Sequence, residues 1–480
     1  MGLKVYNIDF SQFSNDLYLR CDFKYNAFIF KLNWNVFNYA KETIKLRNIL
    51  KSDYKIFEYD YGQEYKGIPT GESYIDEDGY IKDFQIVTYE EHPNRIKYKI
   101  SNNNLLISSI RLAKSPALLF ENINLSEYVF SNGFYIFDVN NNHNMKFILY
   151  LLRTKIIRNI IDNYIYRGIG ISSYKKEDLL NMKIPLIDKQ KQDEIVSLIE
   201  PIEKKIKSLK ETIIPEQKII NEVFAREFGF DENLYNEFGK GMTASTQIAD
   251  DKTFKVFNTD FTDFSKSDIM RFSTRFHNTP TKKLMNILND IDTIKVKNII
   301  FEYEKGIQPN YNSEGEIQVI KIQNLKNSYI DFNDSEYILE EEYNLISDNK
   351  KLKYDDIILC VTGKISLGKI DLYNYKEDAI TTVDNFIIRI TNYNKLFFVY
   401  FFRSILGYFQ IERDFTGTTN QIHLRWKEIE NFKIPNIPLK KQQEIVDEID
   451  NKIKEQQKIN IQIEKERNKI YNIINNYING

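Results

Sequence analysis

The sequence predicts an α/β (α+β) protein made of two copies of one domain, each followed by a long helix, with the two helices pairing as an antiparallel coiled coil. Three observations support this prediction. The chain has 480 residues, which is more than one ordinary hydrophobic core requires. The same patterns occur twice in the same order, about 250 residues apart. A charged segment with isoleucine at heptad spacing closes each half.

The clearest repeat lies where each domain is expected to end. Residues 183–196 and 433–446 align without a gap at an offset of 250 and share Lys-Ile-Pro-x-Ile, followed by Lys-Gln-x-Glu-Ile-Val. Near the start of each half, residues 4–14 align with 255–265. A period this long indicates duplicated domains and not a solenoid of short repeats.

Two further matches lie between these anchors. Residues 105–108 match 357–360, and each is predicted to be a short buried strand. Residues 146–153 match 395–403 with one residue inserted, within one apolar helix expected at roughly 145–164 and 394–412. Short β-branched and aromatic strands with turns between them fill the rest of each domain.

The closing segments are predicted to be long helices. In the first, Pro201 is expected to bend the helix and Pro215 to begin a new one. The second contains polar residues at seam positions, which weaken packing and can set the register. A generic coiled coil explains either segment alone, but two of them, each after a copy of one domain, are expected to hold the domains at a fixed separation. The seam residues are Ile195, Ile199, Ile202, Ile206, Leu209 and Ile213, and then Ile449, Ile453, Ile463, Ile470 and Ile474, interrupted by Gln456, Asn460 and Arg467.

Composition excludes several classes of protein. The two cysteines, Cys21 and Cys360, form no CxxC pattern, which excludes a disulfide framework and a cysteine-based zinc site and fits a reducing cytoplasm. The four histidines show no metal-ligand spacing. No apolar run approaches the roughly 20 residues that span a bilayer, so we expect a cytoplasmic protein. The net charge of −2 counts against a nucleic-acid binder that works without a partner.

The duplicated layout resembles the specificity subunits of Type I restriction–modification systems. The Ile-Pro…Gln-x-x-Ile segment that enters each long helix carries this resemblance at 184–195 and 434–445. In the second half, residues 355–369, with Gly363 and Leu367-Gly368-Lys369, look like the strand-and-glycine pattern of that family. Residues 416–423 look like its loop before the last strand. The first half departs from the pattern, with 111–116 in place of the glycine pair and 167–173 in place of the later loop.

The resemblance implies that DNA recognition, methylation and restriction are carried out by different subunits of one complex. Each target-recognition domain would recognise one half of a bipartite site in double-stranded DNA, and the helices would set the spacer and dock two methylation subunits. Those subunits would transfer methyl from S-adenosylmethionine to adenine N6, and restriction/translocase subunits would use ATP and Mg. This chain is expected to be no enzyme and to bind no cofactor or metal itself. The expected parts are target-recognition domains at 1–184 and 255–434, a central helical spacer region at 185–235, a linker at 236–254 and a C-terminal helical spacer region at 435–480.

Basic and amide side chains near the apolar helices are the candidates for DNA contact. Residues 153–176 carry six basic residues and one acid, and residues 403–427 carry four basic residues and two acids. Such patches supply phosphate contacts, and Arg, Asn and Gln supply recognition of base edges. A solvated helix face explains any one of these residues equally well. The predicted DNA-binding residues are Arg153, Lys155, Arg167, Ser172, Ser173, Lys175, Lys364, Lys369, Arg403, Arg413, Thr418, Thr419, Asn420, Gln421, His423 and Arg425.

Two alternatives from other classes are open at this point. Residues 363–369 fit G-x4-G-K, the pattern of a phosphate-binding loop, but the Ser or Thr that follows in such a loop is absent and a strand-like segment comes next. No Asn/Asp-Pro-Pro-Tyr tetrapeptide of a DNA methyltransferase occurs, so a stand-alone enzyme is disfavoured. The other alternative is a coiled-coil adaptor that assembles partners without binding DNA. Arg20 and Arg271, which the repeat pairs, fit a structural role as well as a DNA-binding one.

Overall fold

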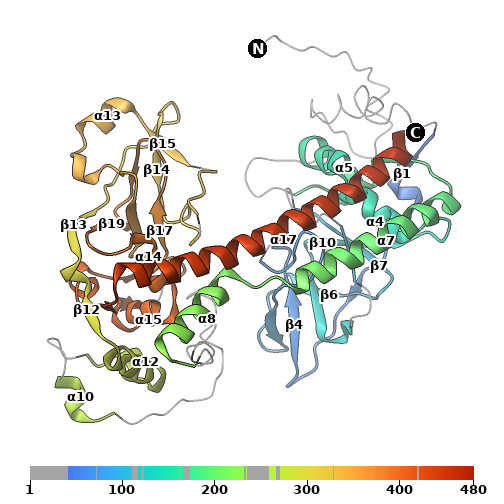
Figure 1. Cartoon of the computed structure of the whole chain (residues 1–480). Coiled ribbons are helices and arrows are strands. Elements are labelled where there is room, and N and C mark those ends of the chain that lie inside the picture. The colour runs from blue at the N-terminus through green and yellow to red at the C-terminus, as the bar shows by residue number, and fades with distance from the viewer. Residues whose placement is uncertain are drawn as a thin grey trace. The chain divides into compact units, whose positions relative to one another are not determined.

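The computed structural model divides the chain into two compact units (Figure 1). It describes residues 42–71, 73–110, 117–120, 124–165, 173–231, 234, 259–265, 271–327, 329–333, 335–418 and 421–479. The first unit comprises residues 1–212 and 460–480, and the second comprises 213–459. The C-terminal helix α17 (Leu439–Asn479) therefore contributes its beginning to the second unit and its end to the first.

The first unit is built on two sheets that follow a short entry clasp. The clasp pairs β1 (Thr43–Lys45) antiparallel with β11 (Lys183–Pro185), so that the chain enters and leaves the domain side by side. One sheet is antiparallel, in the order β2 (Leu50–Ser52), β10 (Phe134–Val139), β7 (Asn104–Ser108) and β8 (Ala117–Leu119). The other sheet has the order β3 (Lys55–Ile56), β6 (Ile96–Lys99), β9 (Tyr128–Ser131), β4 (Glu64–Ile68) and β5 (Gln85–Thr88), with β4 and β9 parallel.

The second unit repeats this plan, which confirms the predicted duplication. Its clasp pairs β12 (Thr293–Lys295) with β22 (Lys433–Pro435) in the same register, with Thr293 opposite Pro435 as Thr43 lies opposite Pro185. Its antiparallel sheet has the order β13 (Ile300–Lys305), β19 (Asn385–Ile390), β16 (Asp356–Cys360) and β17 (Ile370–Tyr373). A smaller sheet contains β15 (Glu336–Ile338), β14 (Ile317–Ile320) and β18 (Ala379–Thr381).

The clasp explains one repeat and reveals another. Both copies place Thr-Ile-Lys opposite Lys-Ile-Pro, so the repeated Lys-Ile-Pro segments are the exit strands of the two domains. The Thr-Ile-Lys segments, at residues 43–45 and 293–295, repeat at an offset of 250 and were not among the predicted anchors. The anchor at residues 4–14 lies outside the described residues.

The prediction of a single apolar helix in each half is wrong, because the structure has two helices in its place. The first pair is α4 (Met145–Arg153) and α5 (Lys155–Ile160), and the second pair is α14 (Lys395–Arg403) and α15 (Ile405–Asp414). Thr154 and Ser404 adopt extended backbone between the helices, and the Thr154 hydroxyl accepts a hydrogen bond from the Ile157 N–H. Hydrophobic periodicity does not show this break because both sides of it are apolar.

The prediction that one residue is inserted in this helix of the second half is also wrong. Asn144 and Asn394 occupy equivalent N-cap positions, where each side chain accepts a hydrogen bond from the backbone three residues later. The helices that they cap have nine residues each, at an offset of 250. The match between Lys146 and Lys395 was therefore one residue out of register.

A buried glutamine attaches each long helix to its domain. Gln192 lies in the first turn of α7 (Lys189–Glu211) and accepts a hydrogen bond from the Asn144 N–H at 2.7 Å. Its amide donates to the Ile187 carbonyl at 2.7 Å. These contacts give a structural role to the glutamine of the repeated Lys-Gln-x-Glu-Ile-Val pattern. In the second unit Gln442, Asn394 and Ile437 make the same contacts, both at 2.8 Å.

The long helices pair antiparallel, as predicted. In the first unit, Glu194 and Lys205 of α7 contact Tyr477 and Glu466 of α17, so the contacts move down one helix as they move up the other. In the second unit, Arg226 of α8 (Glu216–Phe228) contacts Glu448 of α17 in the same sense. Helix α7 continues through Pro201, where a bend was predicted. Helix α8 begins directly after Pro215, as predicted.

The apolar seam residues of these helices complete the domain cores. Ile195 and Ile199 of α7 pack with Ile474 of α17 in the core of the first unit. Ile445 and Ile449 of α17 belong to the core of the second unit. In the parts of the chain that the structure describes, none of the helices combines the length and hydrophobicity needed to cross a membrane.

Candidate nucleic-acid interface

A hairpin and a neighbouring loop form the candidate interface of the second unit. The hairpin consists of β20 (Thr416–Thr418) and β21 (Gln421–His423). The segment after β16 runs antiparallel to β21, with a hydrogen bond from the Leu424 N–H to the Val361 carbonyl at 2.9 Å and one from the Gly363 N–H to the Ile422 carbonyl at 3.1 Å. This register places the loop at residues 364–368 beyond the end of the pairing at which strand β21 begins with Gln421.

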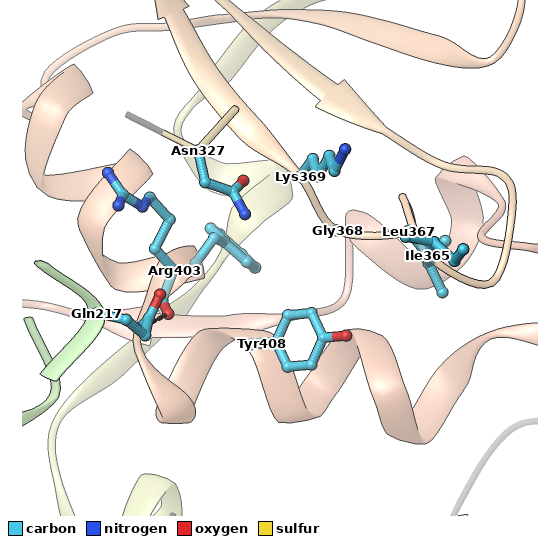
Figure 2. Close-up of a pocket in the computed structure, with 9 residues that line it drawn as sticks. Gln217, Asn327, Ile365, Leu367, Gly368, Lys369, Arg403 and Tyr408 are labelled. Atoms are coloured by element: carbon cyan, nitrogen blue, oxygen red, sulfur yellow. Dashed lines mark hydrogen bonds between the residues drawn. The ribbon is translucent and has the colours of Figure 1, made fainter. Parts of the chain in front are cut away.

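The loop is held by two tight turns. Gly363 and Gly368 both have a φ of 82°, a left-handed conformation that favours glycine. The Ser366 and Leu367 N–H groups donate to the Gly363 carbonyl at 3.1 and 2.9 Å. A Cβ on Gly368 would lie 2.9 Å from the Tyr408 ring, which lies against the loop in Figure 2. The glycine pair predicted from the sequence is therefore a requirement of the backbone and of close packing on α15.

The loop lacks the architecture of a phosphate-binding loop. Lys369 leads directly into strand β17, as predicted, whereas a phosphate-binding loop leads into a helix. The pocket beside the loop has a volume of about 40 Å³ (Figure 2), whereas small-molecule sites have roughly 300–1,000 Å³. Within the residues that the structure describes, no group of three or more His, Cys, Asp and Glu side chains is placed to hold a metal ion.

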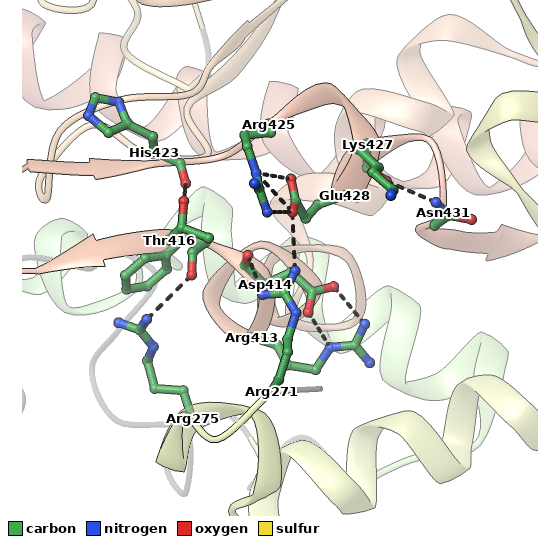
Figure 3. A network of polar contacts seen from close by, with 11 residues as sticks. Arg271, Arg275, Arg413, Asp414, Thr416, His423, Arg425, Lys427, Glu428 and Asn431 are labelled. Atoms are coloured by element: carbon green, nitrogen blue, oxygen red, sulfur yellow. Dashed lines mark hydrogen bonds and ion pairs between the residues drawn. The ribbon is translucent and has the colours of Figure 1, made fainter. Parts of the chain in front are cut away.

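Arginines surround the base of the hairpin (Figure 3). Arg271 and Arg425 both contact the buried carboxylate of Glu428, at 3.2 and 2.5 Å. Arg413 forms an ion pair with Asp414 at 2.6 Å. Arg275 lies over the Phe415 ring at 3.4 Å. Glu412 also interacts electrostatically with Arg275, so four arginines and three acidic side chains, Glu412, Asp414 and Glu428, lie at the base of the hairpin.

The structure gives the predicted residues of the second unit different environments. Arg403 is buried, with 6% of its surface exposed, and pairs with Glu216 of α8 at 2.7 Å. Lys364 and Lys369 are half-buried, and burial lowers the pKa of Lys369. His423 and Arg425 are exposed beside the hairpin. His423 lies opposite Thr362, next to the loop, and Arg425 lies at the base of the hairpin, whereas Arg403 lies in the domain interior.

The predicted residues of the first unit also differ in position. Arg153 donates to the backbone carbonyls of Ala117 and Asp78 at 2.9 and 3.0 Å, which ties α4 to strand β8 and to the turn at Asp78. Lys155 is exposed and lies over the Tyr471 ring. Ser173 and Lys175 are exposed at the start of the segment that leads into α6 (Lys176–Asn181).

The junction that carries the candidate interface occurs in both units. In the first unit the Tyr174 N–H donates to the Ser109 carbonyl at 3.2 Å, and Ile110 forms a β-bridge with Ser173. These bonds correspond to those between Leu424 and Val361 in the second unit, and they confirm the predicted match between strands β7 and β16. The loop at residues 111–116 therefore takes the place of the glycine-containing loop. That loop, and Arg20, Arg167, Ser172, Thr419 and Asn420, lie outside the described residues, as do the side chains of Thr418 and Gln421.

Two residues of this surface were missed at the sequence level. Arg275 stacks on Phe415 but lies outside the segments whose charge was counted, and its counterpart in the first half falls before residue 42. Ile365 is at the tip of the glycine loop with 67% of its surface exposed. A search for basic and amide side chains does not find an isoleucine.

Comparison with a family model bears on the first half. Residues 22–217 match the model of the Type I restriction modification DNA specificity domain. This part of the chain is therefore similar to a Type I restriction–modification DNA specificity domain. The second unit repeats the clasp, the antiparallel sheet, the buried glutamine and the interface junction of the matched segment.

Several solved structures are similar to the chain. One comes from work on the complex assembly and conformational transition of the type I R-M system, with 12% identity, a TM-score of 0.43 and coverage of 92% of this chain and 97% of the other. The HsdS subunit from Thermoanaerobacter tengcongensis has 13% identity, a TM-score of 0.34 and coverage of 92% and 96%. The Type-I restriction-modification system S subunit from M. genitalium has 11% identity, a TM-score of 0.37 and coverage of 90% and 95%. None of the curated proteins compared with the chain matches it.

Proposed function

We propose that this chain is the DNA-specificity subunit of a Type I restriction–modification complex. Each half recognises one half of a bipartite site in double-stranded DNA, and the long helices dock the methylation subunits. The observation that carries this proposal is the match of residues 22–217 to the specificity-domain model, together with the repetition of the matched architecture in the second unit. A chain with two such domains can recognise a two-part site, because each domain can bind one part.

The candidate interface is consistent with this function. The loop at residues 364–368 carries Lys364, His423 lies on the neighbouring strand β21, and Arg425 lies at the base of the hairpin. Basic side chains at such a surface bind phosphates and orient the protein, and loop side chains recognise base edges. The net charge of −2 is compatible with DNA binding in this proposal, because partner subunits supply additional phosphate contacts.

The proposal assigns the chemistry to partners. Two methylation subunits would hold S-adenosylmethionine and methylate adenine N6, and restriction/translocase subunits would use ATP and Mg. This chain would bind no cofactor, catalyse no step by itself and act in the cytoplasm. Its contribution would be the choice of DNA sequence.

Genome-wide methylation mapping tests the proposal. The chain is co-expressed with its candidate methylation subunits in a host without DNA methylation, and N6-methyladenine is located by sequencing. We expect methylation confined to one gapped, two-part motif, and we expect it to disappear when this chain is omitted. A well-expressed complex that carries S-adenosylmethionine and produces no methylation would instead support a coiled-coil adaptor that does not bind DNA.

A further inference from the structure

Ile365 is an exposed apolar side chain on a rigid support. The residue follows the left-handed Gly363, and the hydrogen bonds from the Ser366 and Leu367 N–H groups to the Gly363 carbonyl fix the turn beneath it. Ile365 has 67% of its surface exposed, whereas Leu367, two residues later, is buried at 3%. The loop therefore buries one apolar side chain and presents the other to solvent.

The position of Ile365 places it within the candidate DNA surface. The antiparallel register between residues 361–363 and 422–424 places the loop next to the beginning of strand β21, in the β20–β21 hairpin. The neighbouring side chain in sequence is Lys364, which suits a phosphate. An exposed isoleucine offers no hydrogen bond, so it can distinguish base pairs only through apolar contact. In the major groove the apolar group of a base pair is the C5-methyl of thymine.

We propose that Ile365 recognises the C5-methyl group of a thymine in the half-site that the second unit binds. This inference rests on the proposed function, because it assigns a specificity-determining contact to the same surface. The rigid turn matters because a side chain that is already positioned loses little conformational freedom on binding. Lys364 would contribute affinity for DNA of any sequence, and Ile365 would contribute a preference for thymine at one base pair.

Thymine-to-uracil substitution tests this contact directly, because the two bases differ only in the C5-methyl group. Once the methylated motif is mapped, duplexes are made in which one thymine at a time is replaced by uracil. Their affinities for the complex of this chain with its methylation subunits are measured at fixed salt concentration. We expect one substitution to weaken binding about four-fold, as burial of a single methyl group predicts.

The variant Ile365→Ala, measured with both the thymine and the uracil duplex, completes a double-mutant cycle between the side chain and the methyl group. We expect this variant to bind the unmodified duplex about as weakly as the original complex binds the uracil duplex, and to show no further loss with uracil at that position. Leu345→Ala is the matched control. Leu345 is also apolar, with 88% of its surface exposed, but lies at the end of helix α13 (Glu340–Leu345). This control should keep the full sensitivity to uracil.

Different results separate failure of this contact from failure of the proposed function. A mapped motif without thymine, equal effects of uracil on the original protein and on Ile365→Ala, or loss of uracil sensitivity in Leu345→Ala would each overturn the contact. Sequence-specific methylation would persist in those cases, and the proposed function would stand. A folded complex that binds no duplex and methylates no site would overturn the function and the contact together.

Discussion

At the scale of single residues, Gln442 connects the second domain to its long helix. Its carboxamide accepts from the Asn394 N–H and donates to the Ile437 carbonyl, and only 2% of the residue is exposed. Because water cannot reach these groups, they lose their partners if the carboxamide is removed. The equivalent Gln192 has the same contacts in the first unit, so the same argument applies twice in the chain.

We predict that Gln442→Leu lowers the free energy of unfolding by roughly 1–3 kcal/mol, the cost of leaving buried polar groups unpaired. Chemical denaturation followed by circular dichroism measures this change. The control Lys440→Ala removes an exposed side chain from the same helical turn and should stay within about 0.5 kcal/mol of the original protein. Equal unfolding midpoints for all three proteins would contradict a structural role for this glutamine.

A buried carboxyl makes the stability of the second unit depend on pH. Burial raises the pKa of Asp371 to about 7, although the nearby Arg403 opposes this shift. The folded protein therefore retains a proton that the unfolded chain releases near the ordinary value of 3.8. It follows that this residue makes the free energy of unfolding fall as the pH rises from about 4 to about 7, with no further change above that range.

We predict that Asp371→Asn removes this contribution. The difference in unfolding free energy between the variant and the original protein should increase from pH 4.5 to pH 7 in favour of the variant, and then level off. Denaturation at a series of pH values measures the difference, so that other titrating groups cancel. A difference that does not change with pH would show that the Asp371 carboxyl titrates normally in the folded protein.

At the scale of elements, two of the polar interruptions in the seam of α17, Gln456 and Arg467, make hydrogen bonds within their own unit, whereas Asn460 is exposed. Arg467 donates to Asp78 from Nε at 3.0 Å and from Nη2 at 2.5 Å, within the first unit. Burial alone would raise the pKa of Asp78, but hydrogen bonds from Arg467 and Lys210 outweigh it and hold the pKa below its ordinary value. Gln456 likewise accepts a hydrogen bond from the Ile214 N–H in the second unit.

We predict that Arg467→Ala weakens the attachment of residues 460–479 to the first unit by roughly 1–3 kcal/mol, because Asp78 keeps only its lysine partner. Hydrogen exchange should show faster exchange in this end of α17 while residues 439–455 stay protected. Lys465→Ala removes an exposed cation from the same helix and serves as control. Unchanged protection in Arg467→Ala would mean that the apolar contacts of Ile474 and Ile478 alone hold the helix.

Repeats and periodicity predicted most elements, and their failures have physical causes. The strands at 105–108 and 357–360 and the new helix after Pro215 follow from local patterns. The breaks at Thr154 and Ser404 do not, because a cap in an apolar segment depends on hydrogen bonds that hydrophobicity does not encode. Arg403 was chosen for its charge, yet its partner Glu216 is far away in sequence and is brought close only by folding.

At the scale of the whole molecule, the identical clasps define equivalent segments. Residues 43–185 and 293–435 begin and end with the same paired tripeptides in the same register. A hybrid with residues 293–435 in both positions therefore preserves the backbone pairing at every junction. We predict that this hybrid directs methylation to a site made of two copies of one half of the original motif.

Mapping N6-methyladenine with the methylation subunits present measures the outcome. The reciprocal hybrid, with residues 43–185 in both positions, should give two copies of the other half. A folded hybrid that still methylates the original motif would contradict the assignment of one half-site to each unit.

The division of α17 between the units has a consequence for how the protein is made. The ribosome makes residues 460–479 long after residues 42–212, yet Ile474 and Ile478 belong to the same core as those earlier residues. The nascent first unit must therefore wait, with part of its apolar surface uncovered, until residues 460–479 have been made. A stop codon just before residue 460 would damage the half of the protein that was synthesised first.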